Sequence, residues 1–260
     1  MRLQFNYTVA THLAEFSCPF PAFCAQNPEY THFIGGALIF SPKRENVSMG
    51  ATPAPHEEDG AGQENQQQQQ TPRVLLLQRA FHNSFPGAWE VPGGLCEEDD
   101  RTLLDGVARE VFEECGLRVS RFVELVAKDA WDIPRPDLGL THTLVKYTFL
   151  VEVHEVETGA TAIGDHGYLL ENVGVNGENR RGCFLTSGEA GISRGRRWED
   201  RVVLSAQEHC DYRWAMETEV RRGLERGTGL FALFTRHGHQ VLEGFHAWKR
   251  IWAGVPKPYA

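Results

Sequence analysis

The chain has 260 residues, of which 41% are hydrophobic, so it can bury one sizeable core or two small ones. Its formal net charge of −9 argues against a nucleic-acid polymer as the main partner, although a small anionic substrate held through a metal is compatible with it. No apolar run reaches the roughly 18 residues of a membrane span, and the N-terminus lacks a signal-peptide core. We expect a cytoplasmic protein with no membrane partner; the sequence does not indicate an oligomeric state.

The cysteines show no CxxC pair and no regular spacing. This pattern favours reduced thiols over a disulfide framework or a zinc site. Cys115 falls within a helical pattern, where it fits a small buried hydrophobe. The six cysteines are Cys18, Cys24, Cys96, Cys115, Cys183 and Cys210.

After an N-terminal extension over residues 1–30, two apolar runs predict the first strands. FIGGALIF, Phe33–Phe40, closes at Ser41-Pro42 and is typical of a buried strand. Residues 42–72 then become polar and glutamine-rich, with almost nothing to bury, so we interpret them as a disordered insertion. RVLLLQRA, Arg73–Ala80, resumes as a strand, and we expect the two strands to pair across the insertion.

The middle of the chain alternates turns, one helix and two further strands. Helical periodicity runs from Thr102 to Cys115, and strands are predicted at Phe122–Ala127 and Thr143–Val153. In the second of these strands apolar residues alternate with polar ones such as Lys146 and Thr148, which predicts one face nearer to water.

The C-terminal half begins with a second polar segment. Residues 155–199 are rich in glycine and charge and are interpreted as a second insertion. A short strand is predicted at Arg201–Ala206, followed by helices near Glu217–Glu225 and Leu230–Trp252, with Gly238 as a candidate break in the second. We therefore predict a single α/β domain over residues 31–225, with a C-terminal helix in residues 226–260 packing on it.

The segment AREVFEECGL places three glutamates, Glu110, Glu113 and Glu114, beside one another. Two carboxylates about 4 Å apart repel by roughly 4 kcal/mol at an effective dielectric constant near 20. On a helical projection the acids form one patch beside the apolar stripe, with Glu114 half under its edge and Gly106 leaving space above them. Such oxygen-rich patches suit Mg²⁺ or Mn²⁺, and the alternative is a solvated acidic helix face.

The segment GG-LCEEDD-RTLLDGVA-REVFEECGL resembles the signature of the Nudix hydrolases, G-x5-E-x7-R-E-U-x-E-E-x-G-U with U aliphatic. Its second half agrees at every position from Arg109 to Leu117. Its first half is one residue longer, which brings either Asp100 or Arg101 to the place of the first glutamate. We infer a one-residue loop insertion, with Asp100 as the nearest acidic substitute, in a fungal-type domain carrying two insertions.

The resemblance implies an α/β/α sandwich with a mixed β-sheet, and divalent-metal-dependent cleavage of a diphosphate linkage with Mg²⁺ or Mn²⁺. The partner would be a small-molecule diphosphate, such as a nucleoside diphosphate derivative. Glu110, Glu113 and Glu114 would bind the metal; Arg109, Glu113, Glu114 and Glu208 would be catalytic; Gly93 and Gly94 would let the loop backbone approach the helix and the substrate.

Two questions stay open at this level. Glu208 fits an additional metal ligand or general base, but it also fits a solvated loop glutamate paired with His209. The function also has alternatives: a prenyl or other non-nucleotide diphosphatase, or a catalytically silent Nudix module that binds a ligand. The intact set of Arg109 and three glutamates favours the enzyme, but the signature does not describe the loops that select the organic group.

Overall fold

The computed structural model describes residues 4–43, 71–155, 198–226 and 235–252. Eight strands form a mixed sheet in the order β1-β6-β7-β2-β3-β4, with β5 added to β2 and β8 added to β3. The strands are β1 (Thr8–Val9), β2 (His32–Lys43), β3 (Thr71–Arg79), β4 (Trp89–Glu90), β5 (Gly93–Leu95), β6 (Val119–Arg135), β7 (Leu140–Val153) and β8 (His209–Met216). The helices are η1 (Thr11–Ser17), α1 (Phe20–Gln26), α2 (Leu103–Cys115), η2 (Trp198–Arg201), α4 (Glu217–Arg226) and α5 (Thr235–Trp252).

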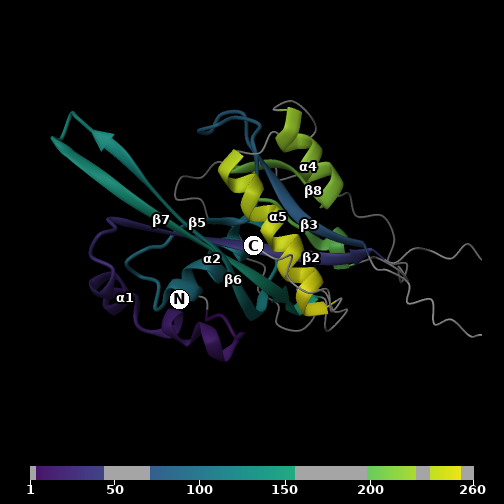
Figure 1. Cartoon of the computed structure of the whole chain (residues 1–260), viewed down its shortest axis with the longest axis horizontal. Coiled ribbons are helices and arrows are strands. Elements are labelled where there is room, and N and C mark those ends of the chain that lie inside the picture. The colour runs from purple at the N-terminus through teal and green to yellow at the C-terminus, as the bar shows by residue number, and fades with distance from the viewer. Residues whose placement is uncertain (1–3, 44–70, 156–197, 227–234, 253–260) are drawn as a thin grey trace, which may run out of the picture.

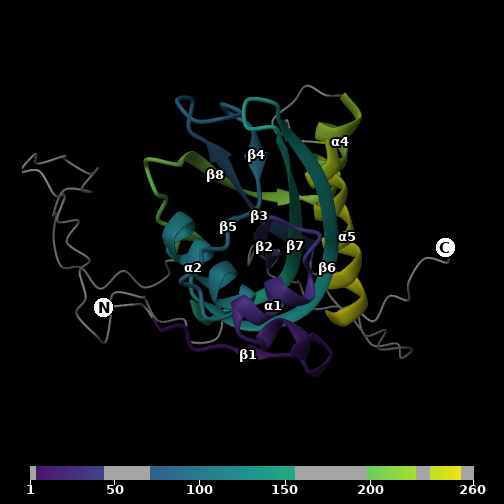
Figure 2. The same ribbon diagram turned by 90° about the vertical axis from the view of Figure 1, so that its left-hand side faces the viewer.

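Helices cover the strands from both sides. Figure 2 shows α2 and α5 on opposite sides of the strands. Two hydrophobic clusters fill the layers, one including Val107 and Val111 of α2 and the other including Phe245 and Trp248 of α5. The β2–β7 and β1–β6 pairs are parallel and the other pairs are antiparallel. The predicted fold class, a mixed sheet between helices, is therefore confirmed.

Local signals define α2 at both ends. The Thr102 Oγ1 atom accepts a hydrogen bond from the Asp105 backbone N–H at 3.0 Å, which caps the N-terminus of the helix. Gly116 ends the helix in the left-handed region, at φ 70°, where a side chain would cost energy. The helix begins within one residue of its predicted start and ends where predicted.

The N-terminal extension packs into the same core as α2. β1 pairs in parallel with β6. The buried aromatic and aliphatic residues of η1 and α1 belong to the cluster that α2 also lines. They are Leu13, Phe16, Phe20 and Phe23. Residues 8–26 therefore contribute to the folded unit around α2.

The residues at the predicted ends of both insertions belong to the folded structure. β2 and β3 pair as far as Pro42 with Pro72 and Lys43 with Thr71, so the proposed limits 42–72 are too wide. Glu155 is buried and accepts a hydrogen bond from the Arg118 N–H, and buried Glu199 accepts one from Ser41 Oγ. These carboxylates are ordered because core strands supply their partners. Residues 44–70 and 156–197 lie outside the described residues.

The predicted strand at Arg201–Ala206 is wrong. The chain leaves η2 and runs past the C-terminus of α2, where the N–H groups of Val203 and Ser205 donate to the Cys115 and Glu114 carbonyls at 3.0 and 3.2 Å. The apolar run thus caps a helix instead of joining the sheet. The strand lies later, at β8, which pairs antiparallel with β3.

The face of β7 predicted to be near water is also buried. Lys146 and Thr148 are 4% and 0% exposed because α5 covers this side of the sheet. The Thr148 Oγ1 atom donates to Gln240 Oε1 of α5 at 3.0 Å. Of the polar members of this alternation, Lys146 and Thr148 are covered, whereas 30% of the Glu152 side chain is exposed, so the prediction of a wetter face holds only near the end of the strand.

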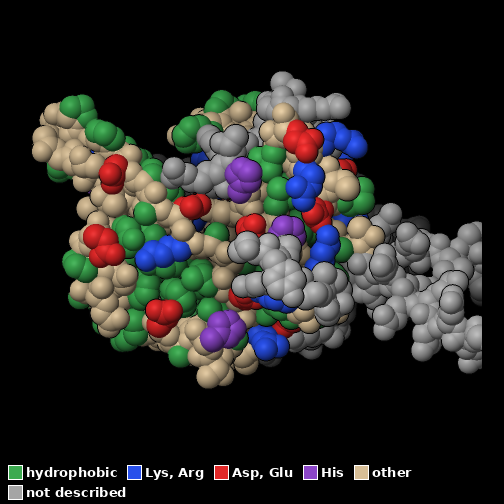
Figure 3. All heavy atoms as spheres, in the orientation of Figure 1, with side chains coloured by type: hydrophobic (Ala, Val, Ile, Leu, Met, Phe, Trp, Pro, Cys, Tyr) green, Lys and Arg blue, Asp and Glu red, His purple; other side chains and the backbone are tan. Residues whose placement is uncertain are grey.

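The β6–β7 hairpin is much longer than predicted. Its outer end projects away from the other strands (Figure 1), and the pairing continues to Arg135 opposite Leu140. Hydrophobic side chains lie on the surface there (Figure 3), including Ile133, Leu138 and Leu140. The short periodic segment seen in the sequence was only the buried half of this hairpin.

Gly238 does not interrupt α5, so the candidate break is wrong. A Cβ atom at this position would lie 2.2 Å from Leu224 Cδ2 of α4. The glycine therefore permits close packing of the two C-terminal helices. The part of the predicted helix before residue 235 lies outside the described residues.

Candidate active site

Glu114 lies at the centre of the acidic patch, beneath the turn between β4 and β5. Its side chain is buried, with only 4% of the residue exposed, and so is more enclosed than the predicted half-covered position. The carboxylate accepts a hydrogen bond from the Gly93 N–H at 2.7 Å. Gly93 has φ 150°, and a Cβ atom there would lie 2.1 Å from the Gly35 carbonyl oxygen. Only glycine lets this backbone reach the Glu114 carboxylate.

Gly94 makes room for a second acid of the patch. A Cβ atom on Gly94 would lie 2.6 Å from the Glu110 carboxyl group. Gly94 is held in place because β5 pairs with β2, opposite Gly35. The loop backbone therefore comes close to the helix, as predicted for Gly93 and Gly94.

Arg109 joins the acids of the patch through its guanidinium group. The Nε and Nη2 atoms each donate to the Asp100 carboxylate at 3.0 Å. The Nη1 atom donates to Glu110 Oε1 at 2.9 Å and to Glu113 Oε2 at 3.0 Å. One positive charge thus serves three carboxylates in a geometry that fixes their relative positions.

Asp100 occupies the place inferred for the first signature acid. It binds Arg109 and also accepts a hydrogen bond from the Glu97 N–H at 2.8 Å, whereas Arg101 turns away to Asp105 at 3.1 Å. The space predicted above Gly106 is already filled, because a Cβ atom there would lie 2.7 Å from Asp100 Oδ2. The prediction that this space admits a ligand is wrong.

Burial raises the proton affinity of the two inner acids. The pKa of Glu110 is raised to about 7 by burial, with further increases from the charges of Glu113 and Glu208, although Arg109 opposes them. Burial likewise raises the pKa of Glu114 well above its usual value, and neighbouring carboxylates add to this against the Gly93 hydrogen bond. Burial is thus the main reason that these carboxyl groups favour a bound proton, and a bound cation would offset the same cost of burying their charge.

Glu208, in the loop before β8, and His209, the first residue of β8, reach the site together. The ligand atoms of Glu114, Glu208 and His209 lie within 4.8 Å of one another. The loop is held by the Ala80 N–H, which donates to the Glu208 carbonyl at 2.8 Å, and by the Ser205 carbonyl, which accepts from the His209 N–H at 2.9 Å. Glu208 is thus near the predicted metal ligand, although 94 positions separate Glu114 from it.

Glu208 is exposed, as the alternative of a solvated loop glutamate expects, but His209 beside it is buried. It is 2% exposed, and its Nε2 atom lies 3.3 Å from Glu90 Oε1 and 3.9 Å from Glu114 Oε1. Sequence reasoning missed its burial because β8 was not predicted. In the sequence, the one indication that His209 belongs to the site is its position directly after Glu208.

Glu113 lies at the solvent edge of the patch. Half of its side chain, 50%, is exposed, and its carboxylate is held by Arg109. It is not among the three residues whose ligand atoms converge. The arrangement therefore has an inner part, centred on Glu114, and an outer part formed by Glu113.

Two cationic side chains, Arg79 and Lys146, lie near Glu90. The Arg79 Nη1 atom contacts Glu90 Oε1 at 2.6 Å. Lys146 is fully enclosed, and burial lowers its pKa despite the opposing charges of Glu90 and Glu114. The positive charges of Arg79 and Lys146 compensate the negative charge of Glu90 more directly than the charges of Glu110 and Glu114.

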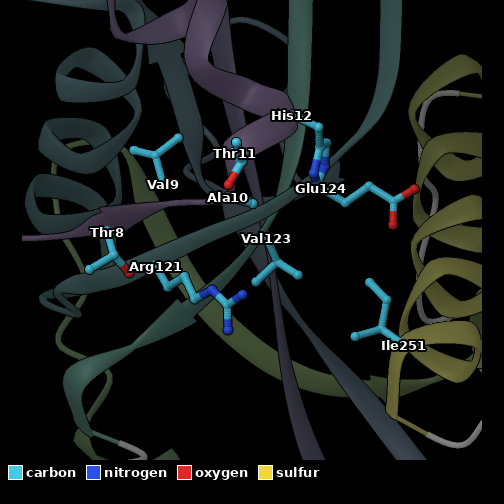
Figure 4. A pocket seen from close by; sticks show the side chains of 9 residues that line it. All are labelled: Thr8, Val9, Ala10, Thr11, His12, Arg121, Val123, Glu124 and Ile251. Carbon is cyan, nitrogen blue, oxygen red and sulfur yellow. The ribbon is translucent and has the colours of Figure 1, made fainter.

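A separate hollow of about 650 Å³ lies between the N-terminal segment, β6 and α5 (Figure 4). Among its described lining residues Glu124 is the one carboxylate, and it is paired with Arg250. The hollow shares no residue with the acidic patch. Its lining is Thr8, Val9, Ala10, Thr11, His12, Arg121, Val123, Glu124 and Ile251.

Comparison with known families matches the NUDIX domain to residues 63–172. The match includes the β4–β5 turn and α2 but ends before β8. A MutT-like protein from Streptomyces ambofaciens is 51% identical over 47 residues, which are 18% of this chain and 27% of that protein. The chain thus matches only about a quarter of the length of this curated relative.

Several solved structures resemble the chain at low sequence identity. The MutT protein from Methanosarcina mazei Go1 has a TM-score of 0.39 and 17% identity, covering 85% of this chain and 94% of its own. The NUDIX domain of Shewanella oneidensis NrtR, complexed with ADP ribose, has a TM-score of 0.41 and 15% identity, covering 84% and 87%. A C. elegans Ap4A hydrolase has a TM-score of 0.40 and 12% identity, covering 86% and 100%.

None of the helices in the described ranges is long and apolar enough to cross a membrane.

Proposed function

We propose that the chain belongs to the Nudix family, whose domain matches residues 63–172, and that it is a divalent-metal-dependent hydrolase of a diphosphate linkage. The substrate would be a nucleoside diphosphate derivative or a related organic diphosphate. The observation that carries the proposal is the buried carboxylate of Glu114, which lies within 4.8 Å of ligand atoms from a second element of the fold. An acidic helix face that is only solvated would not require ligand atoms from another element to lie beside it.

The donor set fits a divalent cation. Glu114 is a buried acid and Glu110 a partly buried one, burial raises the pKa of both, and Glu113 adds a third carboxylate at the edge. Carboxylate oxygens suit Mg²⁺ and Mn²⁺, which retain waters and bind substrate phosphates. When bound, the cation would neutralise the diphosphate, orient it and acidify a water molecule.

The chain's own residues have distinct roles in this proposal. Arg109 holds Asp100, Glu110 and Glu113 in one geometry, so it is a positioning residue for the metal ligands. Gly93 and Gly94 let the loop backbone lie against Glu114 and Glu110, so the loop would border the phosphate groups of a bound substrate. Glu208 is exposed beside Glu114, so its carboxylate is available to accept a proton from water.

The proposal covers the class of linkage and not the organic group. The loops that would select a nucleoside or a prenyl group are not part of the matched signature, so both remain within the proposal. A silent ligand-binding module is disfavoured by the complete set of Arg109 and the three glutamates. The cytoplasmic location and the fungal type of the domain stay predictions.

A substrate panel with Mg²⁺ tests the proposal. We expect release of phosphate or phosphorylated products from at least one diphosphate compound, loss of release in excess chelator, and recovery on addition of metal. Phosphate monoesters should be hydrolysed at least about tenfold less efficiently, because a metal that bridges two phosphoryl groups stabilises the transition state most. Comparable monoester turnover, or full activity in chelator, would contradict the proposal.

A further inference from the structure

The loop that carries Glu208 is held by a second loop, residues 80–88, which joins β3 to β4. The Ala80 N–H donates to the Glu208 carbonyl at 2.8 Å. The Asn83 Nδ2 atom donates to the Gln207 carbonyl at 3.0 Å and to the Glu208 carbonyl at 3.3 Å. These two contacts of Asn83 join residues 124 and 125 positions apart, so only the tertiary structure creates them.

The Gln207 carbonyl depends on side chains for its hydrogen bonds. Within the described ranges its partners are Asn83 and the His82 ring, whose Nε2 atom lies 3.0 Å from the carbonyl oxygen. Asn83 is the residue that joins the two consecutive carbonyls, so its amide fixes the orientation of the peptide unit between Gln207 and Glu208. Without this amide, the bond from Ala80 would leave the peptide unit free to turn.

The loop that supplies Asn83 has an enforced conformation. The Arg79 Nε atom donates to the Ser84 carbonyl at 2.7 Å, and the Gln78 Nε2 atom donates to the Gly87 carbonyl at 3.1 Å. Phe85 has φ 56° and is the one non-glycine residue with positive φ in the described part of the chain. A bulky residue adopts this region only where the surrounding structure imposes it. The β3–β4 loop is therefore a fixed support.

Glu208 needs such a support because its side chain has no support of its own from burial. It is exposed and lies in a loop, yet one of its carboxylate oxygens is within 4.8 Å of ligand atoms of Glu114 and His209. A group that accepts a proton must stay within hydrogen-bond reach of it, and a displacement of about 1 Å can cost roughly 100-fold in rate. The backbone of Glu208 therefore determines whether its carboxylate can act.

We propose that Asn83 is a positioning residue that places the Glu208 carboxylate for proton transfer from water. Asn83 acts through the backbone of residues 207 and 208 and need not touch the substrate or the metal. The inference rests on the proposed hydrolase function and adds a residue to it from outside the matched acidic helix.

Substitution of Asn83 in the full chain tests the proposal at saturating Mg²⁺, with the diphosphate compound that the substrate panel shows to be turned over best. In Asn83→Ala, kcat should fall by about tenfold while KM stays within about twofold of the parent's. Asn83→Asp should lose at least as much, because an ionised carboxylate cannot donate to either carbonyl.

Asn27→Ala is the matched control. The Asn27 Nδ2 atom donates to the Phe23 carbonyl at 2.8 Å, which is the same kind of bond at the end of α1. Both alanine variants should unfold at similar temperatures, but kcat of Asn27→Ala should stay within about twofold of the parent's.

A double-mutant cycle separates positioning of Glu208 from a general structural role. Glu208→Gln should lower kcat by about 100-fold or more. Adding Asn83→Ala to this variant should change kcat by less than about twofold, because no base remains to be positioned.

Amide hydrogen exchange supplies a measurement that needs no substrate. The N–H groups of Glu208 and His209 both donate to the Ser205 carbonyl, at 3.0 and 2.9 Å. They should exchange faster in Asn83→Ala than in the parent, and at the parent's rate in Asn27→Ala.

The outcomes separate this inference from the proposed function. Unchanged exchange in Asn83→Ala, a loss confined to KM, an equal loss in the Glu208→Gln background, or full turnover of Glu208→Gln would each overturn the role of Asn83. All four leave the hydrolase proposal intact. Absence of hydrolysis of any diphosphate by the parent would contradict both.

Discussion

The α2 patch and a C-terminal cluster formed by Glu217, Arg221 and Lys249 shift the pKa of a glutamate in opposite directions. In the C-terminal cluster, Glu217 of α4 is paired with Arg221 at 2.8 Å and with Lys249 of α5. These hydrogen bonds and charges lower the pKa of Glu217, although partial burial opposes them. In the α2 patch the pKa of Glu110 is instead raised to about 7, because burial outweighs its contact with Arg109.

Besides burial, the two sites differ in how many cations serve each carboxylate. Two cations meet Glu217, whereas the Arg109 guanidinium is shared by Asp100, Glu110 and Glu113. Glu114 has no arginine or lysine contact within hydrogen-bond distance among the described residues and depends on the Gly93 N–H. The first cluster is complete without a ligand, and the second leaves negative charge for a cation to neutralise.

The largest expected effect follows from removing the charge of Glu114. Glu114→Gln retains an oxygen that can accept from the Gly93 N–H but lacks the charge needed to bind a metal. Mg²⁺-dependent turnover should fall by about two or more orders of magnitude, since metal positioning supplies several kcal/mol of transition-state stabilisation. The thermal midpoint in chelator should stay equal or rise slightly, because repulsion within the patch decreases.

The matched control is Glu217→Gln, which removes the same charge from the complete cluster. Its turnover should remain within about twofold of the parent's, because Glu217 lies outside the α2 patch. A Glu114→Gln protein that unfolds at a lower temperature yet turns over normally would show that Glu114 is structural.

Arg109→Lys tests the arginine that organises the patch. Lysine retains one positive charge but cannot make the paired contact with both oxygens of Asp100. The free energy of unfolding in chelator should fall by about 1–3 kcal/mol, and turnover should fall by about tenfold or more. Urea unfolding and steady-state kinetics measure these two effects.

Arg101→Lys serves as the control for this substitution. Its side chain is 61% exposed and contacts only Asp105 in this region, so the cost should stay below about 0.5 kcal/mol. Equal losses in the two variants would mean that Arg109 contributes only an ordinary surface ion pair.

The two clusters should also respond oppositely to pH. In chelator, the folded pKa of Glu110 near 7 exceeds its ordinary value of 4.5, so protonation of Glu110 stabilises the fold. This contribution is complete below about pH 4.5 and is lost as the pH rises through 7, on the order of 3 kcal/mol in total. Denaturant unfolding from pH 5 to 7.5 should show a steeper loss for the parent than for Glu110→Gln.

Excess Mg²⁺ should reverse the trend, because metal binding requires the ionised carboxylate. Identical pH slopes for the parent and Glu110→Gln in chelator would show that Glu110 does not carry the raised pKa.

The smallest effect is expected for the stability of Glu217→Gln. Loss of its pairing with partly exposed Arg221 and Lys249 should lower the free energy of unfolding by about 0.5–1 kcal/mol at pH 7. Because its folded pKa is lowered, this stabilisation is present above about pH 4.5 and is lost on acidification through the folded pKa. Parent and variant should therefore converge in denaturant midpoint at low pH, and a constant difference would contradict the assignment.

Local patterns alone determined much of this protein. The limits of α2 follow from its apolar spacing, the Thr102 cap and Gly116, and each of these acts within a few residues along the chain. β2 and β3 were recognisable because continuous apolar runs require burial on both faces. The clustering of Glu110, Glu113 and Glu114 is a property of one helix and needed no knowledge of the rest of the chain.

Only the tertiary structure decided which neighbours complete the patch. Glu208 and His209 meet Glu114 because β8 joins β3 and because Val203 and Ser205 are hydrogen-bonded to the end of α2. Lys146 appeared to face water until α5 was seen to cover it. Periodicity reports contacts between residues a few positions apart, whereas burial and charge at a site depend on segments that are distant in sequence.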